Sequence, residues 1–418
     1  MKTNIIICLV IALSSQLYAQ QGWTYQNSAL TNNQYGAICA INKDTICVMA
    51  DQGLFLKTMN GGTTWVSQTT GLPEAYFDLA FTSSETGYAL GRNGLLIKTD
   101  DGGTTWFKSV SGTAKDLFSI FILSPGNIWV VGDSGVILHS VDMGETWLKI
   151  TGLTTQRLNS VCFRDASIGY IAGNAGTLLK TVNGGINWEP VSLGTTKDLS
   201  SLTATNGNTF LLAGFVYGYG AGADEFYKTN DNVNWTSGFI GTPYLGPSKL
   251  FFQNDNLGFC ITANCTTNGD CGIFIGKTTD SGQFWLTSYD NWNPPSMVGI
   301  AYADIDFVTD SIGYALSGNN ILKTTDGGTF VGVKELNDPK SFTISPNPPL
   351  SGTLNITLHM TDLNGLSAEI SDMNGKVFIS MGNLKNFNQV DVSKFSCGVY
   401  LVKLLRNHNM IAVEKLLK

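Results

Sequence analysis

The chain has 418 residues, of which 43% are hydrophobic and only 14% are charged, with 47 glycines and a formal net charge of −7. High glycine and aromatic content with low charge favours β structure with many turns. The acidic balance argues against nucleic acid as a partner, because phosphate binding requires clustered Lys and Arg. The length predicts two or three domains, unless one of them is a large all-β unit.

The N-terminus has the pattern of a secretory signal peptide. Lys2 precedes an apolar run from Ile5 to Leu13, and the small Ala19 stands at the −1 cleavage position. The run is too short to span a bilayer. We therefore expect residues 1–19 to be removed on export, and no other stretch is long and apolar enough for a transmembrane span.

Export makes disulfides possible. Cys260, Cys265 and Cys271 crowd one short segment, where a local bridge is expected, with Cys265–Cys271 as the candidate pair. Cys39 and Cys162 fall at equivalent places in apolar strands and are predicted to be buried thiols. No Cys/His spacing is typical of a metal site, so we predict neither a metal nor a cofactor.

One motif, which we call the box, recurs along the chain. Thr99–Trp106 reads T-D-D-G-G-T-T-W, and related segments end at Trp65, Trp147, Trp188, Trp235, Trp285 and Phe330. The first four Trp residues are 41 residues apart, and the later intervals are 47, 50 and 45. A period near 40 residues with strand-like segments between the motifs is the signature of propeller blades.

Each repeat contains three apolar segments before the box. We expect these to be strands a, b and c, with the box as the hairpin between c and d and its Trp starting strand d. After the signal peptide, G-W-T-Y resembles the start of a strand d, with Trp23 in the position of Trp65. This strand should complete the last blade, whose own box ends early at Phe330, and so close the ring.

The box residues are predicted to be structural. The Asp or Asn accepts backbone N–H bonds within the turn, and the Trp fills the gap beside a neighbouring strand. Two boxes use Asn in place of Asp, which a calcium site would tolerate poorly. The structural positions are Asn60, Trp65, Asp101, Trp106, Asp142, Trp147, Asn183, Trp188, Asp231, Trp235, Asp280, Trp285 and Asp326.

These boxes resemble the Asp boxes (BNR repeats) of sialidase-like propellers. The fuller repeat, with F-x-D, G-Y and L-K-T before the box, is similar to the photosystem II stability and assembly factor family over about residues 23–330. That resemblance implies a non-enzymatic propeller that works by binding protein. One fold hosts many functions, so the implication for function is weaker than that for fold.

The composition changes near residue 333. Short alternating strands and N-G turns predict a small antiparallel β-sandwich. The P-N-P segment near Pro348, the turn Asp372–Lys376, the strand G-V-Y-L-V-K and the terminal K-L-L-K look like the type A sorting domain of type IX secretion. The resemblance implies a Bacteroidota-type cell, handling by the type IX machinery, and a product that is secreted or attached to the outer surface.

The turns of an antiparallel blade divide between two faces. Turns c–d, which hold the boxes, share one face with turns a–b, so a ligand should meet the opposite face. A sialidase needs three converging Arg residues, but of the propeller's three, Arg164 falls on the box side. Sialidase activity is therefore not expected, and no catalytic residue is assigned.

The main alternative is a secreted Asp-box glycoside hydrolase acting on a polysaccharide with two carboxylates. Its candidate acids are Asp51, Glu74, Asp116, Asp133, Asp198, Asp224, Glu225, Asp270 and Asp290.

Long loops of the fifth and sixth blades gather aromatic, amide and acidic residues on the face opposite the boxes. Such surfaces suit contact with carbohydrate or protein. Decorative loops with locally buried aromatics are the alternative. The candidate binding residues are Tyr217, Tyr219, Asp224, Glu225, Tyr289, Asp290, Trp292, Arg92 and Arg157.

The sequence thus predicts an all-β protein, a seven-bladed β-propeller followed by a small antiparallel β-sandwich. The expected boundaries are 1–19 for the signal peptide, 20–332 for the propeller, 333–341 for a linker and 342–418 for the sorting domain. The expected function is binding or scaffolding by an exported protein, with an unknown protein or carbohydrate ligand.

Overall fold

A computed structural model gives the architecture of the chain. Two compact units are present, Met1–Gly328 and Thr329–Lys418, and each is described by itself. The structure describes residues 22–26, 35–205, 207–213, 225–240, 249–265, 271–283, 285–290, 303–317, 320–328, 342–347, 352–360, 363–372, 376–396, 399–406 and 409–418. The predicted signal peptide lies outside these residues.

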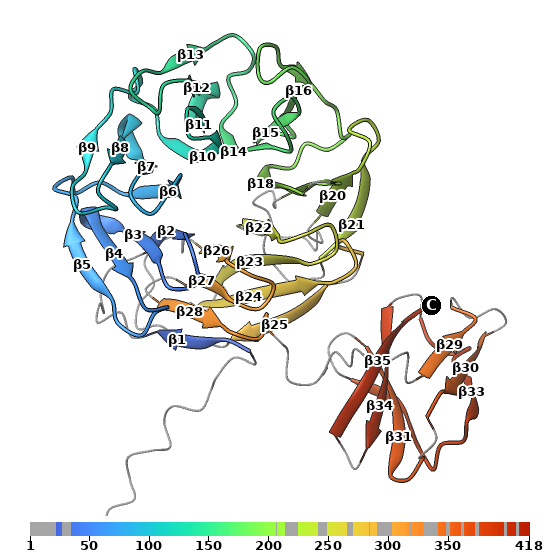
Figure 1. The fold of residues 1–418 in the computed structure, drawn as a ribbon. Coiled ribbons are helices and arrows are strands. Elements are labelled where there is room, and N and C mark those ends of the chain that lie inside the picture. The colour runs from blue at the N-terminus through green and yellow to red at the C-terminus, as the bar shows by residue number, and fades with distance from the viewer. Residues whose placement is uncertain are drawn as a thin grey trace, which may run out of the picture. The chain divides into compact units, whose positions relative to one another are not determined.

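The described strands of the first unit form seven four-stranded antiparallel sheets, arranged around a central axis (Figure 1). These are the seven blades that the repeat predicts. Strands of the first four blades are β2 (Tyr35–Ala40), β3 (Ile46–Ala50), β4 (Leu54–Thr58), β5 (Val66–Thr69); β6 (Tyr76–Phe81), β7 (Gly87–Gly91), β8 (Leu96–Thr99), β9 (Phe107–Lys108); β10 (Leu117–Ser124), β11 (Asn127–Gly132), β12 (Ile137–Ser140), β13 (Leu148–Ile150); and β14 (Leu158–Phe163), β15 (Gly169–Gly173), β16 (Leu178–Thr181), β17 (Glu189–Pro190).

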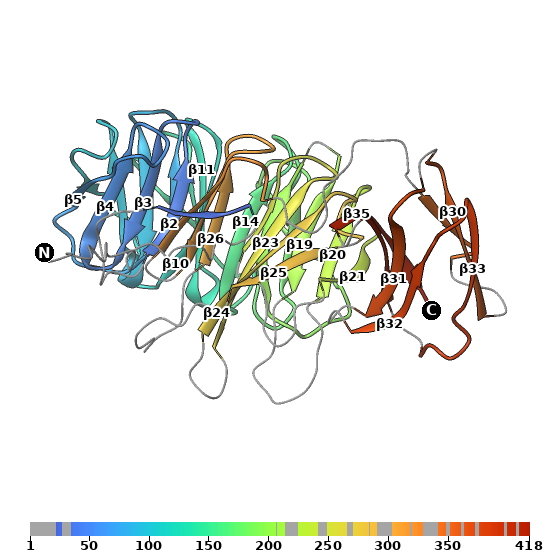
Figure 2. The same ribbon diagram turned by 90° about the horizontal axis from the view of Figure 1, so that it is seen from below.

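The remaining three blades follow the same order, with longer intervals between strands. Their strands are β18 (Leu199–Ala204), β19 (Thr209–Ala213), β20 (Glu225–Thr229), β21 (Thr236–Phe239); β22 (Lys249–Phe252), β23 (Gly258–Cys265), β24 (Cys271–Thr278), β25 (Leu286–Asp290); and β26 (Ala303–Phe307), β27 (Gly313–Ser317), β28 (Asn320–Thr324), with β1 (Thr24–Gln26). Seen from the side, the blades stack face against face in a disc (Figure 2).

Burial is most complete in strand b, lower in the innermost strand a and lowest in strand d at the rim. Strand b lies between neighbouring blades on both faces, so every residue of β3, β7 and β15 is buried. This explains why strand b reads as a continuous apolar run instead of alternating. Strand d is the outermost, and β9 is exposed along its length.

The box Trp does not start strand d, as the sequence predicts, but stands immediately before it. Its backbone still belongs to the box turn.

The N-terminal strand closes the ring, as the sequence predicts. β1 pairs antiparallel with β28, and Tyr25 stands opposite Leu322. Trp23 is 1% exposed and its ring meets Phe307 edge-on at a centroid distance of 5.8 Å. The first and last segments of the propeller therefore share one sheet, which removes the free edge of the last blade.

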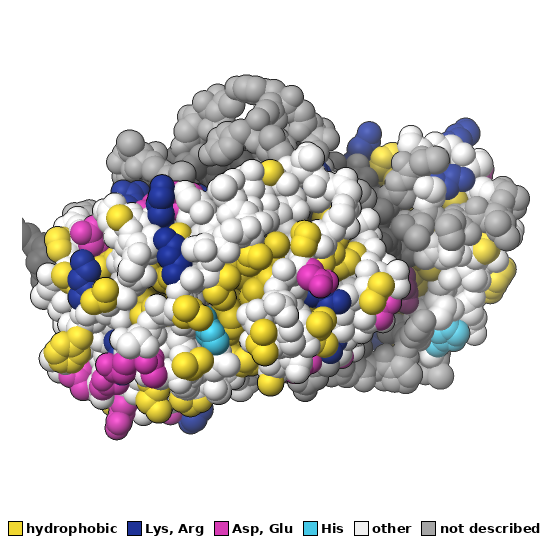
Figure 3. All heavy atoms as spheres, turned by 90° about the horizontal axis from the view of Figure 1, so that it is seen from above, with side chains coloured by type: hydrophobic (Ala, Val, Ile, Leu, Met, Phe, Trp, Pro, Cys, Tyr) yellow, Lys and Arg dark blue, Asp and Glu magenta, His cyan; other side chains and the backbone are white. Residues whose placement is uncertain are grey.

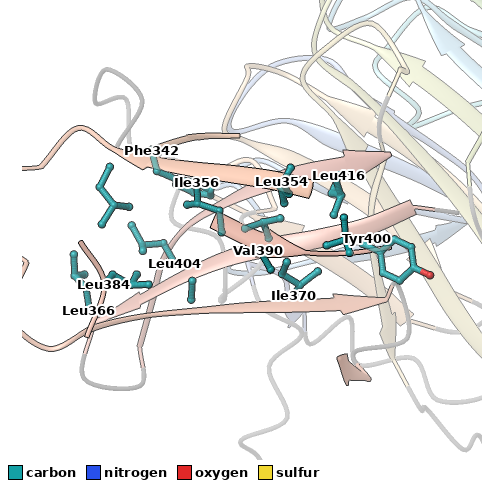
Figure 4. Packing of buried hydrophobic residues seen from close by; sticks show 14 residues of the cluster. Phe342, Leu354, Ile356, Leu366, Ile370, Leu384, Val390, Tyr400, Leu404 and Leu416 are labelled. Carbon is teal, nitrogen blue, oxygen red and sulfur yellow. The ribbon is translucent and has the colours of Figure 1, made fainter. Parts of the chain in front are cut away.

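The second unit is a β-sandwich. One sheet holds β29 (Phe342–Ser345), β30 (Thr353–Leu358) and β33 (Phe387–Asp391); the other holds β32 (Val377–Gly382), β31 (Leu366–Asp372), β34 (Val399–Arg406) and β35 (Asn409–Leu417). Side chains of both sheets pack into one apolar core, among them Ile356, Val390, Tyr400 and Leu404 (Figure 4). Among the described residues of the chain, no helix is long and apolar enough to cross a membrane.

Replacement of Trp23 by Ala should destabilise the propeller by about 3–5 kcal/mol, the usual cost of removing a buried Trp. Tyr25→Ala on the same strand is the matched control, since that side chain is 42% exposed. We expect it to change the urea midpoint little. Equal midpoints for the two variants would contradict a closing role for Trp23.

Candidate functional site

Each box is held by the same small network. In the second box, the Thr99 hydroxyl donates to Asp101 Oδ1 at 2.8 Å and accepts the Gly103 N–H at 2.8 Å. Asp101 Oδ1 also accepts the Thr105 N–H at 2.8 Å. These bonds lower the pKa of Asp101, the Thr105 bonds most. The hydroxyl-to-carboxyl or hydroxyl-to-amide bond recurs in the other boxes through Asn60, Asp142, Asn183, Asp231, Asp280 and Asp326.

The box Trp residues pack inside the propeller. Trp106 meets Phe55 of the preceding blade edge-on at 5.3 Å, and Trp188 meets Trp129 at 5.6 Å. Gly103 allows this contact, because a Cβ there would lie 2.3 Å from the Phe55 ring. The Trp side chains therefore join one blade to the next.

In several blades, a Lys at the end of strand c donates a hydrogen bond to a backbone carbonyl in the box of the next blade. Lys57 donates to the Gly102 carbonyl at 2.9 Å, and Lys180 donates to the Asn232 carbonyl at 2.6 Å. Across the closure, Lys323 donates to the Gly61 carbonyl at 2.6 Å. His139 takes this slot in the third blade and stacks on Trp129 at 3.8 Å. The boxes are thus occupied by contacts within the fold.

Hydrogen bonds sort the turns into two faces. The Gly61 N–H of the first box bonds the Asp44 carbonyl in turn a–b, so boxes and a–b turns lie together. Arg164 of a later a–b turn donates to Asn232 in the fifth box. On the other side, the Thr70 N–H after strand d bonds the Gly53 carbonyl in turn b–c. We call this second side the loop face.

The b–c turns of the first blades have one geometry. Gln52, Asn93, Ser134 and Ala175 occupy the same turn position with φ between 54° and 57°. The first three belong to short 3-10 turns: η1 (Asp51–Gly53), η2 (Arg92–Gly94) and η3 (Asp133–Gly135).

Carboxylates of the following segments cap two of these turns. Asp116 accepts the Asn93 N–H at 2.9 Å, and Asp198 accepts the Ala175 N–H at 2.9 Å. Two of the acids considered for hydrolysis are therefore engaged in structural bonds.

A cluster of planar groups lies on the loop face where the innermost strands begin. The rings of Phe77 and Phe118, from adjacent blades, are 5.2 Å apart. The Arg157 guanidinium sits over the Phe118 ring at 3.7 Å, and its Nε donates to Asn159 at 2.9 Å. Arg157 is exposed, and the two rings are half-buried. We call these four residues the aromatic–arginine cluster.

The cluster contains one of the residues that the sequence predicts for binding. Arg92 is exposed in the η2 turn of the same face. Tyr217, Tyr219, Asp224 and Trp292 lie outside the described residues, and for Glu225, Tyr289 and Asp290 only the backbone is described.

For the predicted Cys265–Cys271 disulfide, only the backbone of the two cysteines is described. Cys265 and Cys271 stand directly opposite each other where β23 and β24 pair, so the backbone register brings the two positions together. Cys162 is a buried thiol and Cys39 a partly buried one. Within the described part of the chain, no group of three or more His, Cys, Asp or Glu could hold a metal ion.

The axis of the propeller is lined by a ring of polar side chains that join neighbouring blades. In each case the innermost strand of one blade accepts an N–H from the innermost strand of the next. The pairs, as acceptor and N–H donor, are Asp78 and Ile120 (2.9 Å), Ser119 and Val161 (3.3 Å), Ser160 and Leu202 (3.0 Å), Ser201 and Leu250 (3.0 Å), and Asp304 and Ile38 (3.0 Å).

Two ring positions, Ala37 and Lys249, offer no acceptor. The next blade compensates in both cases, because Asp78 also accepts the Leu79 N–H at 3.0 Å and Asp304 also accepts the Ile305 N–H at 2.9 Å. Lys249 Nζ lies 3.4 Å from Asp304 and 3.8 Å from Asp78. Burial opposes the Lys249 charge, but the two carboxylates outweigh it and raise its pKa.

Asp306 lies one layer along the same strand. It accepts the Ala40 N–H of the first blade at 2.7 Å and the Phe307 N–H at 2.9 Å. Burial raises the pKa of Asp306 to about 7, and the nearby Asp304 charge adds to this. The seam between the last and first blades therefore contains a carboxyl group that titrates near neutral pH.

The repeat pattern along the chain indicates neither the axial ring nor, apart from Arg157, the aromatic–arginine cluster. A signal for the ring exists, since Asp78, Ser119, Ser160 and Ser201 are 41 residues apart.

The surface also has apolar side chains on the rim, where Val66, Phe107 and Leu148 each follow a box Trp and are exposed. Figure 3 shows hydrophobic side chains gathered over the rim of the third blade.

Two segments match known families. Residues 57–156 match the family described as "Photosynthesis system II assembly factor YCF48", and residues 343–418 match "Secretion system C-terminal sorting domain". No curated protein matches the sequence.

Several solved propellers are similar in fold. The structure titled "YCF48 bound to D1 peptide" is 17% identical with a TM-score of 0.56, covering 73% of this chain and 97% of that one. "YCF48 from Cyanidioschyzon merolae" is 17% identical with a TM-score of 0.54, covering 72% and 98%. A "Streptogramin B lyase structure" is 11% identical with a TM-score of 0.54, covering 72% and 96%. At these identities the likeness concerns the fold alone.

The stability of the protein should fall as the pH rises towards 7, because of Asp306. Its pKa is about 7 in the folded protein against 3.8 ordinarily, so the folded state holds the proton more tightly. By linkage, the contribution is full below pH 4 and is lost up to about pH 7, at about 1.4 kcal/mol per pKa unit.

Asp306→Asn should therefore flatten the dependence of the unfolding free energy on pH between about 4 and 7. The matched control is Asp101→Asn, since the lowered pKa of Asp101 confines its effect to more acidic pH. Chemical denaturation at several pH values measures the slope. A slope in the Asp306→Asn variant equal to that of the wild type would contradict this prediction.

Proposed function

We propose that this chain, a YCF48-like seven-bladed propeller followed by a type IX secretion sorting domain, is an exported, non-enzymatic binding protein. Its ligand is an extended segment of another protein, held on the loop face. The aromatic–arginine cluster is the observation that carries the proposal.

The sorting domain accounts for where the protein acts. The match over residues 343–418 implies handling by the type IX secretion machinery and a cell-surface or secreted location. We propose that residues 1–19 direct the preceding step of export, that the propeller spans 20–332, and that 333–341 link it to a sorting domain at 342–418. The propeller is then the part that meets the ligand.

The chemistry of the cluster suits a polypeptide. Phe77 and Phe118 offer two half-buried rings for apolar or aromatic side chains. Arg157 adds a charged planar group next to the Asn159 amide, which can bond backbone carbonyls or carboxylates. Aromatic and arginine side chains are the residues that dominate the energy of protein interfaces. The cluster also lies on the face that the boxes leave open.

One of the similar propellers supports a peptide over a carbohydrate, because it is YCF48 bound to a D1 peptide. That ligand is a property of that protein, and here it only indicates the class. The hydrolase alternative has less support, since Asp116 and Asp198 accept backbone N–H groups of turns. A general acid for glycoside hydrolysis needs a raised pKa in a substrate-binding cleft.

The test is selection of peptides from a displayed random library on the secreted protein, with a glycan array in parallel. Phe118→Ala and Arg157→Ala should each weaken binding of the selected peptides at least tenfold, as interface anchors do. Lys149→Ala, an exposed cation on the rim strand β13, is the control and should leave affinity unchanged. Selected peptides that bind both cluster variants as tightly as the wild type, or binding to glycans alone, would contradict the proposal.

A further inference from the structure

The sorting domain exposes apolar side chains at one end of its sandwich. In the described part of the second unit, the large apolar side chains that are exposed are Val377 (45%), Phe378 (43%) and Phe387 (57%). Val377 and Phe378 begin β32, and residues 383–386 join the end of β32 to the start of β33, where Phe387 lies. Phe387 is therefore at the opposite end of the sandwich from the other two. We call the end with Val377 and Phe378 the tip.

A β-bulge directs the side chain of Phe378. Where β31 and β32 pair, Ile370 stands opposite Ile379 and Ser371 stands opposite Val377. Phe378 is the extra residue between these pairs and has no partner on β31. Because β32 is an edge strand of its sheet, the bulge lies where such features re-aim a side chain.

Phe378 joins two other aromatic rings, and we call the three residues the tip cluster. Its ring lies 5.3 Å from that of Phe395 and meets that of Tyr400 edge-on at 5.5 Å. Tyr400 lies at one end of the apolar core (Figure 4), and its hydroxyl donates to the Ser396 carbonyl at 3.1 Å. Tyr400 is buried and Phe395 half-buried, so Phe378 is the member that faces water most.

Lysines flank the tip cluster. Lys376 Nζ lies over the Phe378 ring, 5.2 Å from its centroid. Lys394 directly precedes Phe395, and both lysine side chains are exposed. An apolar ring with a cation on either side is thus presented to solvent.

The balance of charge in this domain differs from that of the whole chain. Residues 342–418 contain seven Lys and Arg against five Asp and Glu, whereas the chain has a net charge of −7. At the tip, the bonds from Ser393 lower the pKa of Asp391 most, and the nearby charges of Lys394 and Lys418 lower it further. This excess of cations suits an acidic partner.

Segments that are far apart in the sequence meet at the tip. Asp372, which opens the turn Asp372–Lys376, pairs with Tyr400 on β34. Tyr400 belongs to the strand G-V-Y-L-V-K and pairs on its other side with Leu416 of the terminal K-L-L-K. Three of the four segments that mark this domain in the sequence therefore share one end of the sandwich.

We propose that the tip is the surface by which the sorting domain docks on the secretion machinery, and that its partner there is an acidic segment of a protein. Phe378 enters an apolar pocket of the partner, and Lys376 and Lys394 pair with its carboxylates. The family match gives this domain a role in secretion, and a half-exposed ring contributes less to the core than a buried one. The inference does not depend on the ligand of the propeller.

The test is export of the full chain in a cell that carries type IX machinery. Protein in the medium and on the cell surface is measured against protein retained in the periplasm. Phe378→Ala, and separately Lys376→Glu combined with Lys394→Glu, should each lower export at least tenfold. The retained protein should accumulate in the periplasm.

The other end of the same domain supplies matched controls. Phe387→Ala removes a ring that is more exposed than Phe378, and Lys385→Glu reverses an exposed cation next to β33. Both variants should be exported like the wild type. Normal export of the tip variants, or an equal loss in these controls, would overturn the proposal.

Two measurements separate recognition from folding. The thermal midpoint of the variant with both Lys→Glu changes should lie within a few degrees of the wild type, because both side chains are exposed. This variant therefore carries the test even if Phe378→Ala unfolds. Lys376→Arg combined with Lys394→Arg keeps the charge and should be exported normally; loss of export in that variant would contradict recognition by charge.

Other occupants of the tip give different results. A wild-type dimer that Phe378→Ala dissociates while export stays normal would assign the tip to a second copy of this chain. Binding of the wild type to phosphatidylglycerol vesicles that the Lys→Glu changes abolish, again with normal export, would assign it to an anionic membrane. Either result would overturn the proposal.

Discussion

The innermost strand of every blade has one edge with no strand beside it, and its N–H groups need acceptors from elsewhere. The preceding blade supplies them through Asp78, Ser119, Ser160, Ser201 and Asp304. Each of the two Asp carboxylates has a second oxygen, which accepts an N–H of its own strand. Asp78 accepts the Leu79 N–H and Asp304 accepts the Ile305 N–H, where the preceding blade offers no acceptor. The blades are therefore joined by hydrogen bonds at the axis, and the ring is also closed at the rim, where β1 pairs with β28.

The two faces of the propeller therefore have different roles. The boxes and the Lys residues that bond to them are occupied by contacts between blades, so that face is committed to holding the disc together. The loop face begins at the same innermost strands, which places Phe77 on β6, Phe118 on β10 and Arg157 immediately before β14. A rigid scaffold lowers the entropy cost of holding a ligand.

The sequence predicts the fold well because the signals of the fold are local. Each box and each strand of a blade lie within one repeat, and even the closing strand is visible through Trp23. The axial ring and the aromatic–arginine cluster are contacts between blades, which a motif search along the chain does not join. The 41-residue interval marks four members of the ring, but insertions in the later blades shift Lys249 and Asp304 out of that count. The long loops of the fifth and sixth blades, which the sequence predicts for binding, lie mostly outside the described residues.

The claim that the axial ring joins the blades is tested most directly by hydrogen exchange in an Asp304→Ala variant. Asp304 accepts the Ile38 N–H across the seam, while the Val161 N–H is held by Ser119 on the far side of the ring. The account predicts that exchange at Ile38 accelerates at least tenfold and that Val161 keeps its protection. Unchanged exchange at Ile38 would contradict it.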